Sequence, residues 1–250
     1  QAVGIAITLT NLVKLITAIA LYVFHKINAS IIEYQHNRIK KTLRKQLNIK
    51  EEDFKHIQDL GANCVRLPFH YNIVKEKHWD YLDQALSWAK KNNIYVIMDM
   101  HAAPGAQNAD WHSDSKGKAL LWENRKCRQE LYHLWSQIAQ RYKNEPVIAA
   151  YDVLNEAVGD NLRIIKETYV GITKAIRDTG DRHILFVEGN KWSQEFDFLG
   201  KPWDNQLAFS FHFYWPLEFT FNFVRNLTYP GKINGEYCDI RKIEKALMRY

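Results

Sequence analysis

Polar and titratable side chains stand at equivalent places in this chain, each where a short apolar segment ends. Four apolar runs lead directly into such residues, which are His101, the pair Asn155 and Glu156, Glu188, and His212. A fifth apolar run contains Arg66. Carboxylates and imidazoles can move protons at a reacting bond, and a guanidinium favours the ionised form of a nearby carboxylate. The pattern therefore favours carboxylate acid–base chemistry.

Other chemistries have less support in the sequence. There is no phosphate-binding Gly-rich loop, no HxH or HExxH metal motif, and no GxSxG turn around Ser193 or Ser210. Histidines that could in principle bind a metal are His70, His101, His112 and His212. Imidazoles that hydrogen-bond to nearby carboxylates are the favoured interpretation, so we expect no metal.

The elements that must position these residues alternate along the chain. Apolar periodicity predicts helices over residues 51–60, 79–93, 125–143, 161–178 and 240–249. Short apolar runs predict strands over residues 64–69, 94–100, 147–154, 184–187 and 207–211. This alternation predicts βαβ units and a parallel sheet, which is an α/β fold. In a parallel barrel all strands point the same way, so the polar residues at their carboxyl ends would gather at one rim.

Tryptophan is abundant, with 8 residues, and its positions divide into two groups. Trp79, Trp88 and Trp135 lie on predicted helices and are expected in the core. Five others follow predicted strands, namely Trp111, Trp122, Trp192, Trp203 and Trp215. An exposed indole face suits the C–H face of a sugar ring, whereas a buried one packs a long loop. Both roles stay open for each of these five.

The composition is that of a globular protein, with 250 residues, 46% hydrophobic and 25% charged. Residues 26–50 hold seven basic side chains and one acidic one, which accounts for the whole net charge of +6. The remainder is neutral on balance, so we expect no nucleic-acid groove. Three cysteines at wide spacing predict neither a disulfide framework nor a zinc site. Cys64 opens an apolar run and is expected in the core.

The N-terminal segment differs from the rest and predicts a division into residues 1–50 and residues 51–250. Residues 2–24 are mostly apolar, interrupted by Asn11 and Lys14. Their length suits a membrane span, but a lysine near the centre costs roughly 2.5–3.5 kcal/mol on insertion scales. A membrane anchor and an apolar helix packed on the domain are both open. The corresponding locations are membrane-anchored or extracellular.

Several segments, in order and at the right spacing, resemble the retaining β-glycosidases of glycoside hydrolase family 5, the cellulase family. They are GANCVRLPF (61–69), IMDMHAAPGAQN (97–108), YDVLNEA (151–157), ILFVEGN (184–190) and FSFHFYWP (209–216). The resemblance covers about residues 50–220. It implies a (β/α)₈ TIM barrel and hydrolysis of β-linked glycans without a cofactor.

By position, the resemblance implies a role for several residues of this chain. Glu156 matches the general acid/base, and Asn155 matches the residue that bonds the sugar 2-hydroxyl. Arg66 matches an arginine beneath the nucleophile, which it would keep ionised. Further matches to active-site positions are His101, His212 and Tyr214, and Trp215 is expected to face the cleft. A nearby nucleophile carboxylate would raise the pKa of Glu156, as an acid requires.

The family pattern is incomplete in this sequence. The nucleophile is expected at the end of a seventh strand, but no seventh or eighth strand is evident before Tyr250. The barrel is therefore expected to be incomplete at its C-terminal end, with an atypical N-terminal segment in which residues 3–9 could act as a strand. Glu188 and Glu236 are the candidates within the chain for a second carboxylate. Glu188 matches a family position other than the nucleophile, and Glu236 lies in a Gly-rich loop.

Three functions follow from these observations. The first is a β-glucan-type glycoside hydrolase that uses Glu156. The second is a carbohydrate-binding or inactive barrel that keeps the cleft but lacks the nucleophile. The third is a membrane-anchored interaction protein built on residues 1–50. Sugar binding would separate the first two from the third, and turnover would separate the first from the second.

Overall fold

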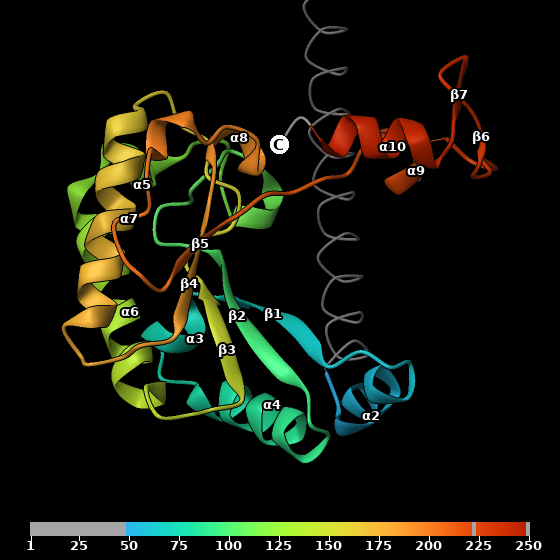
Figure 1. Ribbon diagram of the computed structural model, residues 1–250. Helices are drawn as coiled ribbons and strands as arrows, with labels where there is room; N and C mark the ends of the chain where they lie inside the picture. Colours follow the sequence, from blue (N-terminus) through green and yellow to red (C-terminus); the bar gives the residue numbers. More distant parts are fainter. Residues whose placement is uncertain (1–48, 222–223, 249–250) are drawn as a thin grey trace, which may run out of the picture. The chain divides into compact units, whose positions relative to one another are not determined.

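The computed structural model describes residues 49–221 and 224–248, and these contain a five-stranded parallel sheet (Figure 1). The strands lie side by side in chain order and are β1 (Cys64–His70), β2 (Tyr95–Ala102), β3 (Ile148–Asp152), β4 (Ile184–Glu188) and β5 (Leu207–Ser210). Every neighbouring pair is parallel. The predicted α/β fold is confirmed, with all five strands within a few residues of their expected bounds.

Helices lie before, between and after the strands of the sheet. The longer ones are α2 (Glu51–Asp59), α4 (Trp79–Lys91), α6 (Arg125–Tyr142) and α7 (Leu162–Arg177). Short ones are α3 (Asn72–Lys75), α5 (Leu120–Glu123), α8 (Asn190–Ser193) and α9 (Leu217–Thr220), with 3₁₀ turns at Trp111–Ser113 and Asp197–Leu199. Figure 1 shows α6 and α7 side by side against the sheet. The helices therefore carry the chain back from one end of each strand to the start of the next.

The sequence of α7 explains why this segment is helical. Ile165, Tyr169, Ile172 and Ile176 recur every three or four residues and are all buried. At its start, the side chain of Asn161 accepts a hydrogen bond from a backbone N–H of the first turn. The buried stripe packs the helix on the sheet, and the cap fixes where it begins.

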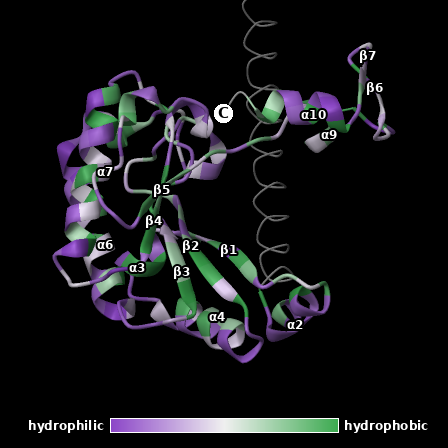
Figure 2. Cartoon of the chain, viewed as in Figure 1, coloured by the Kyte–Doolittle hydropathy of each residue, from purple (hydrophilic) through white to green (hydrophobic). Residues whose placement is uncertain are grey.

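The core lies between these helices and the sheet. The strands contribute Val96, Met98, Met100, Leu185 and Val187, all fully buried. In Figure 2 the strands are coloured mainly hydrophobic, whereas the helices carry both colours along their length. Continuous apolar strands are expected in a parallel sheet whose faces are covered by other elements. Because the core residues fill the strands, the polar side chains among them stand out as exceptions.

After β5 the chain forms smaller elements. The strands β6 (Gly231–Ile233) and β7 (Glu236–Cys238) form an antiparallel hairpin. Its turn is Asn234-Gly235, and both residues have positive φ, which is typical of a tight hairpin. Glu236, expected in a Gly-rich loop, directly follows this turn. The helix α10 (Ile240–Leu247) confirms the last predicted helix and is capped by the side chain of Asp239.

One expectation about a single residue is wrong, and two that were left open are decided. Cys64 is exposed because it opens β1, the edge strand of the described sheet. Trp122 is buried and cannot meet a ligand, since its ring N–H is enclosed by the carbonyl oxygens of Gln107 and Val158 at 2.9 and 2.8 Å. Trp203 lies between β4 and β5 and packs on α7, where it donates a hydrogen bond to a threonine hydroxyl.

Other expectations lie outside the described residues. These are the proposed anchor at residues 2–24, the strand at residues 3–9 and most of the segment 1–50. Within residues 49–221 and 224–248, no helix has the length and apolar character needed to cross a membrane. The division at residue 50 and any membrane association stay predictions. In the same residues the five parallel strands form an open sheet, so they do not by themselves close a barrel.

Candidate active site

Four strands bring charged side chains to one region of the sheet. Arg66 comes from β1, Asp99 from β2, Asp152 from β3 and Glu188 from β4. The strand register pairs Asp99 directly with Asp152 across neighbouring strands. Since the strands are parallel, their carboxyl ends share one edge, which is the edge where barrel enzymes carry their chemistry. The predicted gathering of polar residues at one rim is confirmed for these strands.

Arg66 is the centre of this charged cluster. Its Nη1 lies 2.9 Å from Asp99 Oδ2, and its Nε donates to Asp152 Oδ2 at 2.8 Å. Its Nη2 donates to Asn155 Oδ1 at 2.9 Å and reaches Glu188 Oε1 at 3.1 Å. One guanidinium thus joins three buried carboxylates and the amide of Asn155. A planar fork with several N–H groups can do this, whereas an ammonium group cannot.

The cluster holds more negative than positive charge. Burial, reinforced by the charge of Glu188, raises the pKa of Asp152 well above its ordinary value. Burial also raises the pKa of Asp99, against the opposing effect of His101 and Arg66. Among the described residues, Asp99 Oδ1 and Asp152 Oδ1 have no hydrogen-bond partner. A proton held on Asp152 would lower the electrostatic repulsion inside the cluster.

Glu156 follows β3 and has an unusual backbone. Its φ is +48°, in the left-handed region that costs a residue with a Cβ of order 1–3 kcal/mol. Two contacts hold it there. The backbone N–H of Glu156 donates to Glu188 Oε2 at 2.6 Å, and its carbonyl oxygen accepts from Asn108 Nδ2 at 2.9 Å. The neighbouring loops therefore fix the direction in which the Glu156 side chain leaves the strand end.

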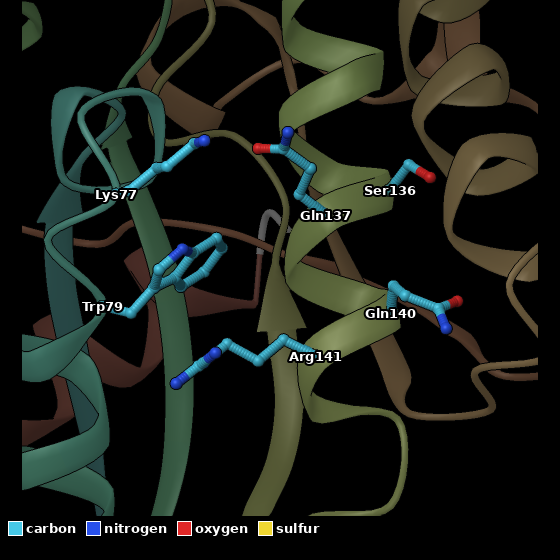
Figure 3. Close-up of a pocket in the computed structure, with 6 residues that line it drawn as sticks. All are labelled: Lys77, Trp79, Ser136, Gln137, Gln140 and Arg141. Carbon is cyan, nitrogen blue, oxygen red and sulfur yellow. The ribbon is translucent and has the colours of Figure 1, made fainter.

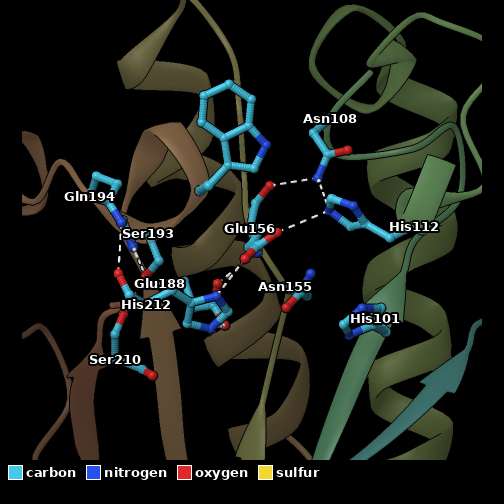
Figure 4. A network of polar contacts seen from close by, with 12 residues as sticks. His101, Asn108, His112, Asn155, Glu156, Glu188, Ser193, Gln194, Ser210 and His212 are labelled. Atoms are coloured by element: carbon cyan, nitrogen blue, oxygen red, sulfur yellow. Dashed lines mark hydrogen bonds and ion pairs between the residues drawn. The ribbon is translucent and has the colours of Figure 1, made fainter. Parts of the chain in front are cut away.

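Two imidazoles hold the carboxylate of Glu156 (Figure 4). His212 Nδ1 lies 2.6 Å from Oε1, and His112 Nε2 lies 3.0 Å from Oε2. The other ring nitrogen of His212 lies 2.9 Å from Glu188 Oε1. His212 thus bridges Glu156 and Glu188 and links Glu156 to the Arg66 cluster.

These contacts set the protonation of the site. Burial alone would raise the pKa of Glu156, but hydrogen bonds and charge from His112 and His212 lower it to about 2. Burial would lower the pKa of His212, but Glu156 and Glu188 raise it to about 10. The expected rise in the Glu156 pKa is therefore reversed, because two imidazoles face this carboxylate in place of a second anion.

The segment after β4 holds His212 in place. Gln194 Nε2 donates to the carbonyl oxygen of His212 at 2.7 Å, and Ser193 Oγ donates to the carbonyl of Ser210 at 2.5 Å (Figure 4). Lys191, Trp192 and Ser193 all have positive φ, so this segment is a tightly constrained turn. It connects the end of β4 to the end of β5 and so fixes the distance between Glu188 and His212.

His101 and three other histidines meet the expectation of carboxylate-bound imidazoles. His101 Nδ1 lies 2.7 Å from Asp99 Oδ2, and His70 Nε2 lies 3.1 Å from Asp114 Oδ2. His112 and His212 contact Glu156 as described. No group of three or more His, Cys, Asp or Glu suited to a metal ion occurs in the described part of the chain.

Exposed aromatic side chains accompany the site. Tyr214 is 45% exposed and lies edge-to-face with His212, at 6.3 Å between ring centroids. Trp215 is 39% exposed, and Trp111 and Trp192 are exposed as well. The ring N–H of Trp192 donates to Asp110 Oδ2 at 2.6 Å, which joins the loop after β2 to the segment after β4. Of the five loop tryptophans, these three remain accessible.

The structure thus brings Arg66, His101, Asn155, Glu156 and His212 into one network, with Tyr214 against it. The roles of Asp152 and Asn108 in this network are not predicted from the sequence. Asp152 lies three residues before Asn155 within a predicted strand. A charged residue inside an otherwise apolar strand is a pattern that could have indicated its role. For Asn108 no local signal existed, since its partners Glu156 and His112 depend on the loop conformation.

A depression lies on the surface between α4 and α6 (Figure 3). It is a surface groove of about 450 Å³, lined by Lys77, Trp79, Ser136, Gln137, Gln140 and Arg141. Arg141 lies over the Trp79 ring at 5.1 Å and donates from Nε to Asp83 at 3.1 Å. These contacts join α4 to α6, and none of the residues of the Glu156 network lines the groove.

The family profile described as Cellulase (glycosyl hydrolase family 5) matches residues 27–240 of the chain. The chain belongs to glycosyl hydrolase family 5. Curated relatives agree with this family 5 assignment. A β-xylosidase of Phanerodontia chrysosporium is 33% identical over 177 residues, which cover 66% of the chain and 37% of that protein. Endoglucanase C of Acetivibrio thermocellus is 30% identical over 208 residues, which cover 75% of the chain and 59% of that protein.

Solved structures agree with the family 5 fold. Thermotoga maritima Cel5A, solved with mannotriose, has a TM-score of 0.62 at 21% identity, over 80% of this chain and 65% of that one. XacCel5A, solved with cellopentaose, has a TM-score of 0.53 at 23% identity, over 65% of this chain and 56% of that one. The fold is therefore that of the family 5 TIM barrel, of which the described residues form five strands. The chain spans between 37% and 59% of the length of the two curated relatives above.

Proposed function

We propose that this chain forms the acid/base side of a retaining β-glycosidase site, with Glu156 as the general acid/base. The observation that carries the proposal is the position of Glu156, which follows β3. Its carboxylate is held by His212, and His212 also contacts Glu188, which pairs with Arg66. Membership of family 5 supports hydrolysis as the reaction class. Retaining hydrolysis needs an acid/base and a nucleophile, with carboxyl groups about 5–5.5 Å apart.

The remaining network supports this assignment. Asn155 directs Oδ1 to Arg66, and its Nδ2 has no hydrogen-bond partner among the described residues but is shielded from solvent. The proposed hydrogen bond from Asn155 to a sugar 2-hydroxyl therefore rests on the family match. In this proposal His212 orients Glu156, and His101 keeps Asp99 hydrogen-bonded beside Arg66. No step requires a cofactor, because two carboxyl groups suffice for the double displacement.

The substrate class in this proposal is a β-linked glycan. Exposed aromatic faces at the rim, Tyr214, Trp215, Trp111 and Trp192, suit the apolar faces of pyranose rings. Similar family 5 structures were solved with cellopentaose and mannotriose, and a similar curated protein is an endoglucanase. These ligands belong to those proteins, and they support gluco- and manno-configured oligosaccharides as the first compounds to test here.

The second candidate function is carbohydrate binding without hydrolysis. The observation in its favour is the burial of the carboxylates around Arg66. Glu188 is fully buried and already shared between Arg66, His212 and the backbone N–H of Glu156, so it cannot reach a sugar carbon. Glu236 lies in the β6–β7 hairpin and pairs with Lys242. Neither candidate from the sequence is placed as a nucleophile.

Binding should depend on Trp215. Replacing Trp215 with Ala should weaken the affinity for cellopentaose by about 1–3 kcal/mol, because the variant loses an aromatic face that the sugar would cover. Isothermal titration calorimetry of the 250-residue chain measures the affinity. Tyr95→Ala is the matched control, since Tyr95 is an exposed aromatic residue at the amino end of β2. Unchanged affinity in a folded Trp215→Ala variant would assign Trp215 to packing, and absence of any sugar binding by the parent chain would contradict the proposed function.

A further inference from the structure

His112 makes a contact with Glu156 that the proposed acid/base mechanism does not use. It lies in the 3₁₀ turn Trp111–Ser113, within the loop that follows β2. Its Nε2 is 3.0 Å from Glu156 Oε2 and also 3.0 Å from Asn108 Nδ2. Both side chains of the pair are largely buried, at 17% and 14% exposure, so water does not replace these contacts freely.

The amide of Asn108 has a fixed orientation. Its Oδ1 accepts from the backbone N–H of Asp110 at 2.9 Å, and its Nδ2 donates to the carbonyl oxygen of Glu156 at 2.9 Å. Exchanging the amide oxygen and nitrogen would lose both hydrogen bonds. The second N–H of Asn108 therefore stays directed at Nε2 of His112.

The two neighbours of Nε2 require opposite hydrogen-bonding roles from this atom. To bind the ionised carboxylate of Glu156, Nε2 must carry a proton and donate. To bind the N–H of Asn108, Nε2 must present its lone pair and accept. One ring nitrogen cannot do both at once, so the geometry provides a hydrogen-bond partner for each of two protonation states of His112.

We propose that His112 is a positioning residue that exchanges one proton with Glu156, and that Asn108 stabilises His112 after the proton has left. In the first state, protonated His112 donates from Nε2 to ionised Glu156. The proton then moves from Nε2 to Oε2. The N–H bond breaks, the O–H bond forms, and no electrons are lost or gained. Neutral His112 then accepts from Asn108, and Glu156 holds the proton that an acid must deliver to a leaving oxygen.

In the chain without substrate, the charges around the pair keep the proton on His112, which is the first of the two states. The hydrogen bond to Glu156, together with the charges of Glu156 and Asp110, raises the pKa of His112, while burial and the charge of His212 lower it. The His101 ring lies 5.9 Å from that of His112. His212 is tied to both Glu156 and Glu188, whereas His112 has only Glu156 as an ionic partner among the described residues. His112 is thus the imidazole that can release Glu156. The inference rests on the proposed role of Glu156.

The test is a titration of the Glu156 side-chain carboxyl by ¹³C NMR in the 250-residue chain. In His112→Ala the acid dissociation constant of Glu156 should fall at least tenfold, because the imidazolium no longer favours the ionised form. His112→Gln keeps a donor without the charge and should give a smaller fall. His133→Ala, at an exposed histidine of α6, should leave the titration unchanged.

The ¹⁵N spectrum of the His112 ring gives a second readout that needs no change at His112. In Glu156→Gln, the proton affinity of His112 should fall at least tenfold. A change of less than twofold in both titrations, with the fold intact, would overturn the proposal. Neither measurement uses sugar or turnover, so a chain that binds no glycan could still show the proton coupling. Failure of the proton exchange is therefore distinguishable from failure of the proposed glycosidase function.

Discussion

Replacing Arg66 with Met is expected to lower the free energy of unfolding by about 3–5 kcal/mol. The reason is that Arg66 is the cation that Asp99, Asp152 and Glu188 share, and removing one partner of a buried ion pair leaves the remaining charges uncompensated. The unsatisfied Oδ1 atoms of the two aspartates show that the cluster has no spare donor among the described residues. Urea unfolding followed by circular dichroism measures the change.

The control for this variant is a surface arginine. Arg163 is 80% exposed and pairs with Glu167 at 3.8 Å, one helical turn away. Arg163→Met should cost about 0–1 kcal/mol, as exposed ion pairs usually do. Arg66→Lys should lie between the two, since it keeps the charge but loses the fork. Equal costs at Arg66 and Arg163 would show that the buried cluster does not depend on its guanidinium.

Replacing Glu156 with Gln should lower kcat on natural β-glucan by about 10²–10⁴-fold in any form of the protein that hydrolyses it. A glutamine cannot donate a proton to the leaving oxygen, and general acid catalysis contributes about this factor. Folding should persist, because glutamine is isosteric. Reducing-end assays on soluble β-glucan measure the rate, with Glu167→Gln on the exposed face of α7 as the control.

The same variant should lose less in the glycosylation step on aryl glycosides with acidic leaving groups. Such a leaving group needs little protonation, so its departure depends less on Glu156. A Glu156→Gln enzyme with wild-type turnover on polysaccharide would exclude Glu156 as the acid/base. A loss of equal size on both substrate classes would point to a structural effect of the substitution.

Most of the scaffold could be predicted from the sequence. The five strands and the long helices are read correctly because each buries a periodic or continuous apolar set, as in α7. The gathering of Arg66, His101, Glu156 and His212 at one edge also follows from sequence, since parallel strands place their carboxyl ends together. The element bounds follow from the local apolar pattern, and the gathering of the site residues follows from the strand direction.

The details that set the chemistry could not be predicted in this way. The pKa of Glu156 depends on His212 and on His112, which reaches it from a loop 44 positions earlier. Asn108, which contacts His112, is oriented by the backbone N–H of Asp110 and the carbonyl oxygen of Glu156. The burial of Trp122 depends on two carbonyl oxygens from separate loops. Contacts of this kind come from loop conformation, for which hydrophobic periodicity carries no information.

The most direct test of the account is the behaviour of residues 1–250 toward a soluble β-glucan. We expect calorimetric binding of cello-oligosaccharides without release of reducing ends, because Glu156 supplies an acid/base while the carboxylates paired with Arg66 are buried. Binding that weakens in Trp215→Ala, with no turnover, is the predicted result. Hydrolysis of β-glucan by this chain at about 1–10³ s⁻¹, an ordinary enzyme rate, would contradict it and would require Glu188 or another carboxylate to act as the nucleophile.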